Sequence, residues 1–236
     1  MSDYDQFAPF YDVLMGDRSD VIAVVRDAIT RYHPASRSLL ELGCGTGSIL
    51  AGFATTHELS GVDLSAKMLK IAQHRLPDAN LKCADLTGLN LHQKYDVIIC
   101  VFDTLNHILL LSGWEEVFRR AKKHLRTNGL FIFDIDTIGR LQDLAAGPGY
   151  TQNLATGTAD LIVTAITASE VEWHITIQDN SRAGAIQVYE EVVREVSFPL
   201  EETRSILAKY FELLESFDSD GSFPSEQSDR VYFVCR

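Results

Sequence analysis

The sequence predicts an α/β protein built on a mostly parallel sheet, and three observations lead to that fold class. Apolar runs alternate with helical patterns through the first 136 residues. The run at 95–102 is continuously apolar apart from Asp96, as in a strand covered on both faces. A glycine-rich turn at 43–47 directly follows another apolar run and opens a helix. The length of 236 residues and a hydrophobic fraction of 46% suit one domain with an ordinary core.

The elements of this α/β part follow in chain order. Apolar residues at helical spacing from Val21 to Tyr32 predict a first helix, which Pro34 ends. Helices are also expected through 49–53, after the N-cap Ser65, and from a capping box at 112–115 to Gly129. The predicted strands of this part are 38–42, 59–62, 81–84, 95–102 and 130–135.

The rhythm changes between about residues 147 and 198. Runs at 161–164, 171–177 and 186–198 alternate polar and apolar residues and leave no room for long helices. They predict an antiparallel β meander inserted into the α/β core. A helix at 201–210 and strands at 211–217 and 230–236 then complete a seven-stranded sheet with helices on both faces.

Charge and cysteine placement narrow the function classes. The formal net charge of -12 argues against a nucleic-acid partner, which needs clustered Lys and Arg. Late glutamates, Glu195 among them, are expected on the surface. Four scattered cysteines predict no metal cluster and a reduced, cytoplasmic setting. The start of the sequence lacks a signal-peptide pattern, and the apolar stretch 97–111 is too short and too polar to span a bilayer.

The strongest chemical signal is the G-x-G-x-G turn after Glu41. A dinucleotide fingerprint would place the third glycine one residue later, and a carboxylate at Glu41 would repel a pyrophosphate but suit an ammonium group. Asp63 ends the second strand, where a carboxylate can accept hydrogen bonds from ribose hydroxyls, and Asp85 ends the third. A nucleoside with a cationic tail fits these acidic groups, and S-adenosylmethionine is such a ligand.

The ordered motifs resemble those of class I S-adenosylmethionine-dependent methyltransferases, which have a Rossmann-like fold. The resemblance rests on Leu39 to Gly47, Gly61 to Ser65, Met68-Leu69, Cys83 to Leu86 and Tyr95 to Ile98. Three further features resemble small-molecule N-methyltransferases of the glycine and TDP-aminosugar type. These are the opening Tyr4-Asp5-x-Phe7-Ala8-x-x-Tyr11-Asp12, the segment Asp103 to His107, and the inserted meander.

The resemblance implies a role for each matching residue. The glycine turn would wrap the methionine part of the donor, Asp63 would hold its ribose, and the residues after the second and third strands would surround its adenine. The implied cofactor-binding residues are Tyr11, Glu41, Gly43, Cys44, Gly45, Gly47, Asp63, Leu64, Met68, Ala84, Asp85, Leu86, Val101 and Phe102. Residues 1–33 would form a helical lid region, and 147–198 a substrate-cap region, of a single methyltransferase domain spanning 1–236.

An amine or hydroxyl acceptor must lose a proton, and His107 is the candidate base because it follows the central strand. Tyr11 is the second predicted catalytic residue, in a lid role. Tyr4, Asp103, Asn106 and Trp173 are the predicted substrate-binding residues. Structural interpretations stay open: His107 could be bonded to backbone, the two tyrosines could pack the amino-terminal helix, and Trp173 could simply cover the sheet.

The sequence therefore predicts a methyltransferase that uses S-adenosylmethionine and a small-molecule acceptor, an amine among the candidates. Its predicted partners exclude nucleic acid and membrane, and a homodimer is left open. Two alternatives remain at this stage. One is a non-catalytic S-adenosylmethionine-binding protein, and the other is an NAD-dependent oxidoreductase, which the glycine spacing and Glu41 disfavour.

Overall fold

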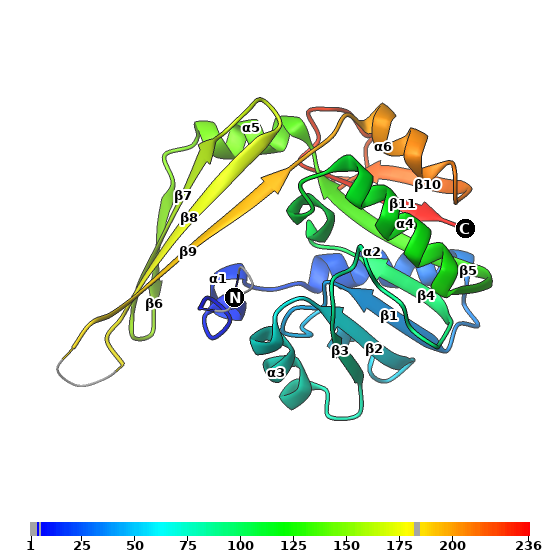
Figure 1. Cartoon of the computed structure of the whole chain (residues 1–236), viewed down its shortest axis with the longest axis horizontal. Coiled ribbons are helices and arrows are strands. Elements are labelled where there is room, and N and C mark those ends of the chain that lie inside the picture. Colours follow the sequence, from blue (N-terminus) through cyan, green and yellow to red (C-terminus); the bar gives the residue numbers. More distant parts are fainter. Residues whose placement is uncertain (1–3, 5, 182–184) are drawn as a thin grey trace.

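A computed structural model describes residues 4, 6–181 and 185–236; Asp5 of the opening motif and residues 182–184 of the expected insertion lie outside them. The chain forms two sheets (Figure 1). Sheet one has seven strands in the order β10-β11-β5-β4-β1-β2-β3, and sheet two is the antiparallel order β6-β7-β8-β9. The predicted fold class is confirmed.

The strands of the first sheet agree closely with the sequence prediction. They are β1 Ser38–Leu42, β2 Glu58–Asp63, β3 Asn80–Cys83, β4 Tyr95–Cys100, β5 Leu125–Asp136, β10 Leu213–Asp218 and β11 Arg230–Cys235. Strands β1 to β5 pair in parallel, and β11 runs antiparallel to both of its neighbours. The carboxyl ends of β1, β2 and β4 therefore meet at one edge, as open α/β sheets require for a ligand site.

Apolar residues of the central strands alternate between two cores, one on each face of the sheet. Leu40, Ile98 and Phe131 pack with α4 (Leu111–His124) and α6 (Leu200–Leu207). Leu39 and Ile99 pack on the opposite face with α2 (Ser19–Tyr32), α3 (Ala66–Arg75) and the 3-10 turn η1 (Leu50–Phe53). Burial on both faces accounts for the continuous apolar run of β4.

Three helix predictions need correction. The helix expected through 49–53 is only the short turn η1. Helix α4 starts after Leu110, whose side chain makes no cap, so the predicted capping box at 112–115 does not form. The helix also stops at His124, because Leu125 already pairs with Tyr95; Gly129 lies inside β5 instead of ending the helix. By contrast, Ser65 caps α3 as predicted, accepting from the Met68 N–H.

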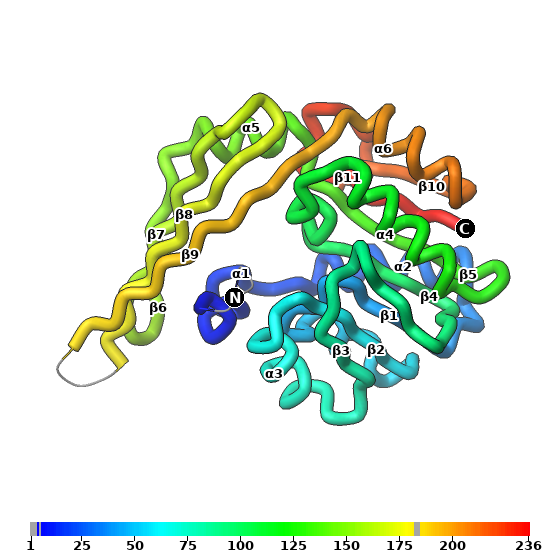
Figure 2. Tube along the Cα trace, viewed as in Figure 1, coloured from blue at the N-terminus to red at the C-terminus, as the bar shows by residue number. Residues whose placement is uncertain are grey.

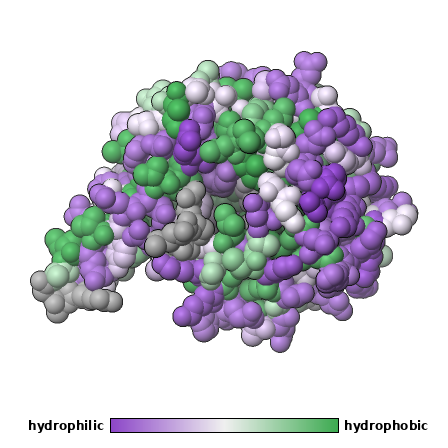
Figure 3. Space-filling model, viewed as in Figure 1, coloured by the Kyte–Doolittle hydropathy of each residue, from purple (hydrophilic) through white to green (hydrophobic). Residues whose placement is uncertain are grey.

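The expected meander is an arm that extends away from the core (Figure 1). It has four strands rather than the three that were predicted: β6 Tyr150–Leu154, β7 Gly157–Ala165, β8 Glu170–Asp179 and β9 Gln187–Val196. Helix α5 (Ile138–Ala146), which was not predicted, connects β5 to the arm and packs against it through Leu141. In Figure 3, apolar surface lies along this arm and around its junction with the core, whereas hydrophilic surface covers most of the rest.

The amino-terminal segment lies between the arm and the core (Figure 2). Phe7, and Leu14 of the short helix α1 (Tyr11–Met15), pack against Leu161, Ile175 and Val193 on the inner face of the arm. Within the described residues, no helix combines the length and apolarity that crossing a bilayer requires.

Asn106 joins the two sheets. It lies in the 3-10 turn η2 (Thr104–His107) and is fully buried. Its side-chain nitrogen donates to the Asp136 carbonyl at 3.0 Å and to the Val196 carbonyl at 2.9 Å, and its side-chain oxygen accepts from the Asp136 N–H at 3.0 Å. One side chain therefore fixes the ends of β5 and β9 relative to η2.

We expect Asn106→Ala to lower the free energy of unfolding by about 2–4 kcal/mol, because buried backbone groups of β5 and β9 lose their partners. Urea denaturation of both proteins measures this difference. The matched control is Asn153→Ala, since Asn153 is exposed on β6. Equal effects of the two substitutions would contradict the joining role of Asn106.

Candidate active site

A cavity of about 210 Å³ opens at the carboxyl ends of β1, β2 and β4. The turn after β1 and the segments after β2 and β4 line one part of it, and the amino-terminal segment and β9 close the other part. Fourteen predicted site residues lie in its wall: Tyr4, Tyr11, Glu41, Gly43, Cys44, Gly45, Asp63, Leu64, Met68, Asp85, Leu86, Val101, Phe102 and His107.

The glycine turn is held against β2 by backbone and carboxylate hydrogen bonds. Gly43 has φ +73°, and a Cβ atom there would lie 2.3 Å from Cγ2 of Thr104, so the position admits only glycine without rearrangement. The carboxylate of Asp63 accepts from the Gly45 N–H at 2.7 Å and from the Ser65 N–H at 2.8 Å. Asp63 thus organises the turn in addition to facing the cavity.

Glu41 forms part of the cavity wall although it is only 2% exposed. Its Oε2 atom has no hydrogen-bond partner among the described residues. Burial, and next the charge of Asp63, raise the pKa of Glu41 well above its ordinary value. A desolvated carboxyl with an unpaired oxygen is suited to a ligand that brings a positive charge or a hydrogen-bond donor.

The amino-terminal segment is tied to the glycine turn. Asp12 accepts from the Thr46 hydroxyl at 2.6 Å and pairs with Arg75 of α3 at 2.6 Å. This contact places Tyr11 in the cavity wall. Burial and the charge of Asp103 raise the pKa of Tyr11, so its hydroxyl stays protonated at neutral pH and can donate a hydrogen bond but cannot serve as a base.

The chain makes a left-handed turn directly after β4. Phe102 and Asp103 have φ values of +63° and +57°, and the buried carboxylate of Asp134 accepts from both of their N–H groups at 2.8 Å. Burial raises the pKa of Asp134 to about 6, and Arg230 opposes the rise. The Arg230 guanidinium also bonds Asp103 at 3.1 Å and Asp136 at 2.9 Å.

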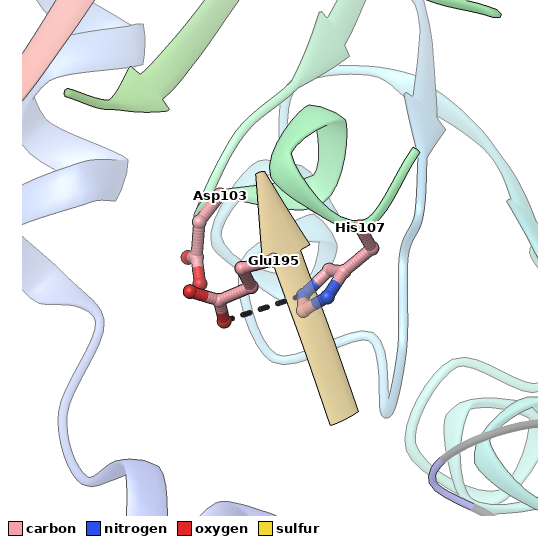
Figure 4. A group of neighbouring side chains, drawn as sticks. All are labelled: Asp103, His107 and Glu195. Carbon is pink, nitrogen blue, oxygen red and sulfur yellow. Dashed lines mark ion pairs between the residues drawn. The ribbon is translucent and has the colours of Figure 1, made fainter. Parts of the chain in front are cut away.

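His107 follows this turn and faces the cavity. Its Nε2 atom lies 3.1 Å from the Tyr4 hydroxyl and 4.0 Å from Oε1 of Glu195. Its Nδ1 atom is buried, with no partner among the described residues. Figure 4 shows the side chains of Asp103, His107 and Glu195 converging from the turn before η2, from η2 and from β9. A histidine in this position can accept a proton from a group in the cavity.

Five predicted residues lie outside the cavity wall. The Asn106 side chain is engaged by backbone groups, which leaves no N–H to donate to a substrate, so its predicted substrate contact needs correction. Gly47 packs on Ala72 of α3 and on Leu76, which directly follows that helix. Ala84 packs against the core beside α4. Asp103 bonds Arg230. Trp173, on β8 of the arm, packs against the apolar cluster on the arm's inner face.

Three residues near the cavity were not predicted from the sequence: Arg18, Glu195 and Arg230. Glu195, expected on the surface, is only 4% exposed. Alternation along β9 could have revealed it, because Glu195 shares a strand face with the apolar Val193. Arg18 is also buried, with its guanidinium 4.2 Å from the centre of the Phe102 ring. Arg18 bonds the nearby carbonyls of Met15 and Gly16, but its contact with Phe102 is distant along the chain. Nothing in the local sequence marks Arg230, since its carboxylate partners are far away along the chain.

Comparison with known proteins agrees with this geometry. The family described as "Methyltransferase domain" matches residues 39–129, which contain the glycine turn, Asp63, Asp85 and His107. A putative methyltransferase of Geobacillus sp. (strain WCH70) is 26% identical over 99% of both chains.

A dTDP-3-amino-3,6-dideoxy-alpha-D-glucopyranose N,N-dimethyltransferase of Streptomyces fradiae is 30% identical, over 50% of this chain and 45% of that protein. The chain therefore matches less than half the length of that relative. An S-adenosylmethionine-dependent methyltransferase structure from Clostridium acetobutylicum ATCC 824 has a TM-score of 0.87 at 21% identity, covering 99% of this chain and 98% of the other. Fold and family match together confirm the class I resemblance stated from the sequence motifs.

We expect Arg230→Met to lower the free energy of unfolding by about 3–5 kcal/mol near neutral pH, because three carboxylates lose their buried cation. Burial raises the folded-state pKa values of Asp134 and Asp136 above those of the unfolded chain, so protonation of these two carboxyls stabilises the folded state. The loss should therefore be smaller at about pH 5.5 than at about pH 8.

Urea denaturation at the two pH values provides the measurement. Arg194→Met is the control, since Arg194 is exposed and makes its ion pair with Glu170 alone among the described residues. An equal loss at both pH values would show that the carboxylates do not depend on Arg230.

Proposed function

We propose that this chain, a class I S-adenosylmethionine-dependent methyltransferase, transfers the methyl group to an amine of a small molecule and binds the donor through the residues predicted for it. The observation that carries this proposal is that the glycine turn, Glu41, Tyr4 and His107 all line one cavity. An amino sugar is the favoured acceptor class, because one relative is named as a methyltransferase of an amino sugar nucleotide.

The donor's two ends match different parts of the cavity. The unpaired Oε2 of Glu41 suits the α-ammonium group, and the close approach allowed by Gly43 and Gly45 suits the methionine part. Asp63, Leu64, Met68 and Asp85 would hold the ribose and adenine. When bound, the donor supplies an electrophilic methyl group on a sulfonium.

The chain's own contribution is positioning and proton removal. Val101 and Phe102 at the end of β4 would border the reacting centre, and Tyr4 and Tyr11 would exclude water from it. Phe102 is held rigidly, because its N–H is bonded by Asp134 and its ring stacks with Arg18. His107 would take the proton that a cationic amine must lose before its lone pair is free. The amino-terminal segment and the arm would then serve as lid and substrate cap.

Incubation with isotope-labelled donor and a panel of amino sugar nucleotides and other small amines, followed by mass spectrometry, tests this function. A product heavier by one labelled methyl group on nitrogen is expected. Tight S-adenosylhomocysteine binding with no methylated product from any amine would instead favour a non-catalytic donor-binding protein.

We expect His107→Ala to reduce kcat by about 10²–10⁴-fold while leaving S-adenosylhomocysteine affinity nearly unchanged, because only the proton acceptor is removed. Steady-state kinetics across a range of pH values measure this loss. His92→Ala is the control, since His92 is exposed outside the cavity. Turnover within a few fold of the wild type at every pH would leave His107 a structural residue.

We expect Glu41→Gln to weaken S-adenosylhomocysteine binding by about tenfold to a hundredfold, as the loss of a charged hydrogen bond predicts. The unliganded protein should not melt earlier, because the substitution removes a desolvated carboxylate. In the wild type, affinity should rise with pH as Glu41 ionises, and this dependence should disappear in the variant.

Calorimetric titration at several pH values measures both effects. Glu58→Gln is the matched control, because Glu58 is exposed at the start of β2. Unchanged affinity in Glu41→Gln would remove Glu41 from the proposed donor site.

A further inference from the structure

Glu195 is the least expected residue near the cavity. It lies on β9 of the arm, two positions after Val193, which is part of the cavity wall. Both side chains are on the face of β9 that turns toward the core, and Trp173 of β8 pairs with Val193 on the same face. Glu195 therefore lies next to the cavity, and its side chain faces that of His107 (Figure 4).

Burial of the Glu195 carboxyl is only partly compensated: the Trp173 side chain and the charge of Arg230 lower its pKa, but less than burial raises it. Its Oε2 atom has no hydrogen-bond partner within the described residues, and neither does Nε1 of Trp173. Among the described residues, no Lys or Arg makes an ion pair with Glu195. Arg230 pairs instead with Asp103, Asp134 and Asp136. Burial, and next the charges of Asp103 and Asp136, raise the pKa of Glu195 well above its ordinary value.

A buried acidic group of this kind favours a ligand that carries a positive charge. One ligand atom each from Asp103, His107 and Glu195 lie within 4.8 Å of one another. Two kinds of cation could be shared by such atoms: an ammonium group or a divalent metal ion.

The spacing favours an ammonium group. An ammonium nitrogen bonded to both His107 Nε2 and Glu195 Oε1 at about 2.8 Å, across their separation of 4.0 Å, would have an angle of about 90° between its two partners. A zinc ion with ligand distances of about 2.1 Å would need an angle of about 145°, much further from tetrahedral.

Aromatic groups beside His107 and Glu195 also favour an ammonium group. The Tyr4 ring centre is 5.5 Å from that of His107 and forms an edge-on pair with it. Trp173 packs in the same apolar cluster as Tyr4. Faces of Trp and Tyr attract organic cations, which include the partly methylated amines that repeated transfer would produce.

We propose that Glu195 binds the positively charged amine of the acceptor beside His107. This inference rests on the proposed function, because it assigns the acceptor end of the same cavity. It makes Glu195 a specificity-determining residue that selects a cationic amine over a neutral hydroxyl compound of the same shape.

Methyl transfer to the bound amine requires that its nitrogen first lose a proton. One N–H proton of the bound ammonium passes to Nε2 of His107, after Tyr4 releases that atom, and leaves a neutral amine with a lone pair. This pair forms the N–C bond to the methyl carbon, while the C–S bond breaks and its electrons stay on sulfur as a thioether. The methylated amine is again a cation, and the carboxylate of Glu195 stabilises it as it stabilised the substrate.

Binding of hexylammonium and hexan-1-ol to protein saturated with S-adenosylhomocysteine tests the proposal without requiring turnover. The wild type should bind hexylammonium more tightly than hexan-1-ol. Glu195→Gln should weaken hexylammonium binding about tenfold or more and leave hexan-1-ol and S-adenosylhomocysteine binding unchanged. Glu195→Asp, which keeps the charge but shortens the side chain, should lie between the two proteins. Glu190→Gln on the exposed face of β9 makes the same charge change and should have no effect.

Two results would overturn the proposal. One is equal hexylammonium affinity in the wild type and in Glu195→Gln. The other is micromolar binding of Zn²⁺ that depends on Glu195 and displaces hexylammonium, which would make the cluster a metal site. Absence of methyl transfer to any amine, with charge-selective binding intact, would instead contradict only the proposed function.

Discussion

The turn after β4 is the constraint on which the rest of the site depends. Its left-handed backbone at Phe102 and Asp103 is unfavourable for side-chain-bearing residues, and the Asp134 carboxylate stabilises it by accepting both N–H groups. Arg230 in turn neutralises the carboxylates gathered there. The turn carries the chain into η2, where Thr104 closes on Gly43, Asn106 bonds the arm, and His107 faces the cavity. One buried charge cluster thereby sets the relative positions of the donor side, the acceptor side and the arm.

Whether a feature of this structure could be predicted from the sequence depends on how far apart its interacting residues lie along the chain. Residues whose role follows from neighbours along the chain were found, as with the glycine turn after β1, the acidic residues at strand ends, and Ser65 as a cap. The α4 prediction failed because pairing of Leu125 with Tyr95 overrode a plausible local capping box. Arg230 was missed because its partner Asp103 lies 127 residues away. Strand alternation could have indicated that Glu195 is buried, but not its contact with His107, which lies 88 residues away. No local pattern encodes such pairings.

The structure also shows where part of the chain's negative charge lies. From composition, the net charge of -12 only argued against nucleic acid. The structure places several of these carboxyls in the interior, at Glu41, Asp134, Asp136 and Glu195. Asp134 and Asp136 are balanced by Arg230 within the described residues, so their cost in desolvation is offset by the ion pairs and hydrogen bonds that shape the turn.

Glu41 and Glu195 differ from these two carboxyls, because each keeps an oxygen without a hydrogen bond in the described part of the chain. A folded protein gains no stability from such a group, so its retention next to a ligand cavity is best explained by the ligand. Glu41 lies on the side of the glycine turn, and Glu195 on the side of His107 and the arm. A donor with an ammonium group at one end and an acceptor with an amine at the other would supply both missing partners. The two unpaired carboxyls are therefore complementary to the two cations of a single amine methylation, whereas a neutral acceptor would leave one of them uncompensated.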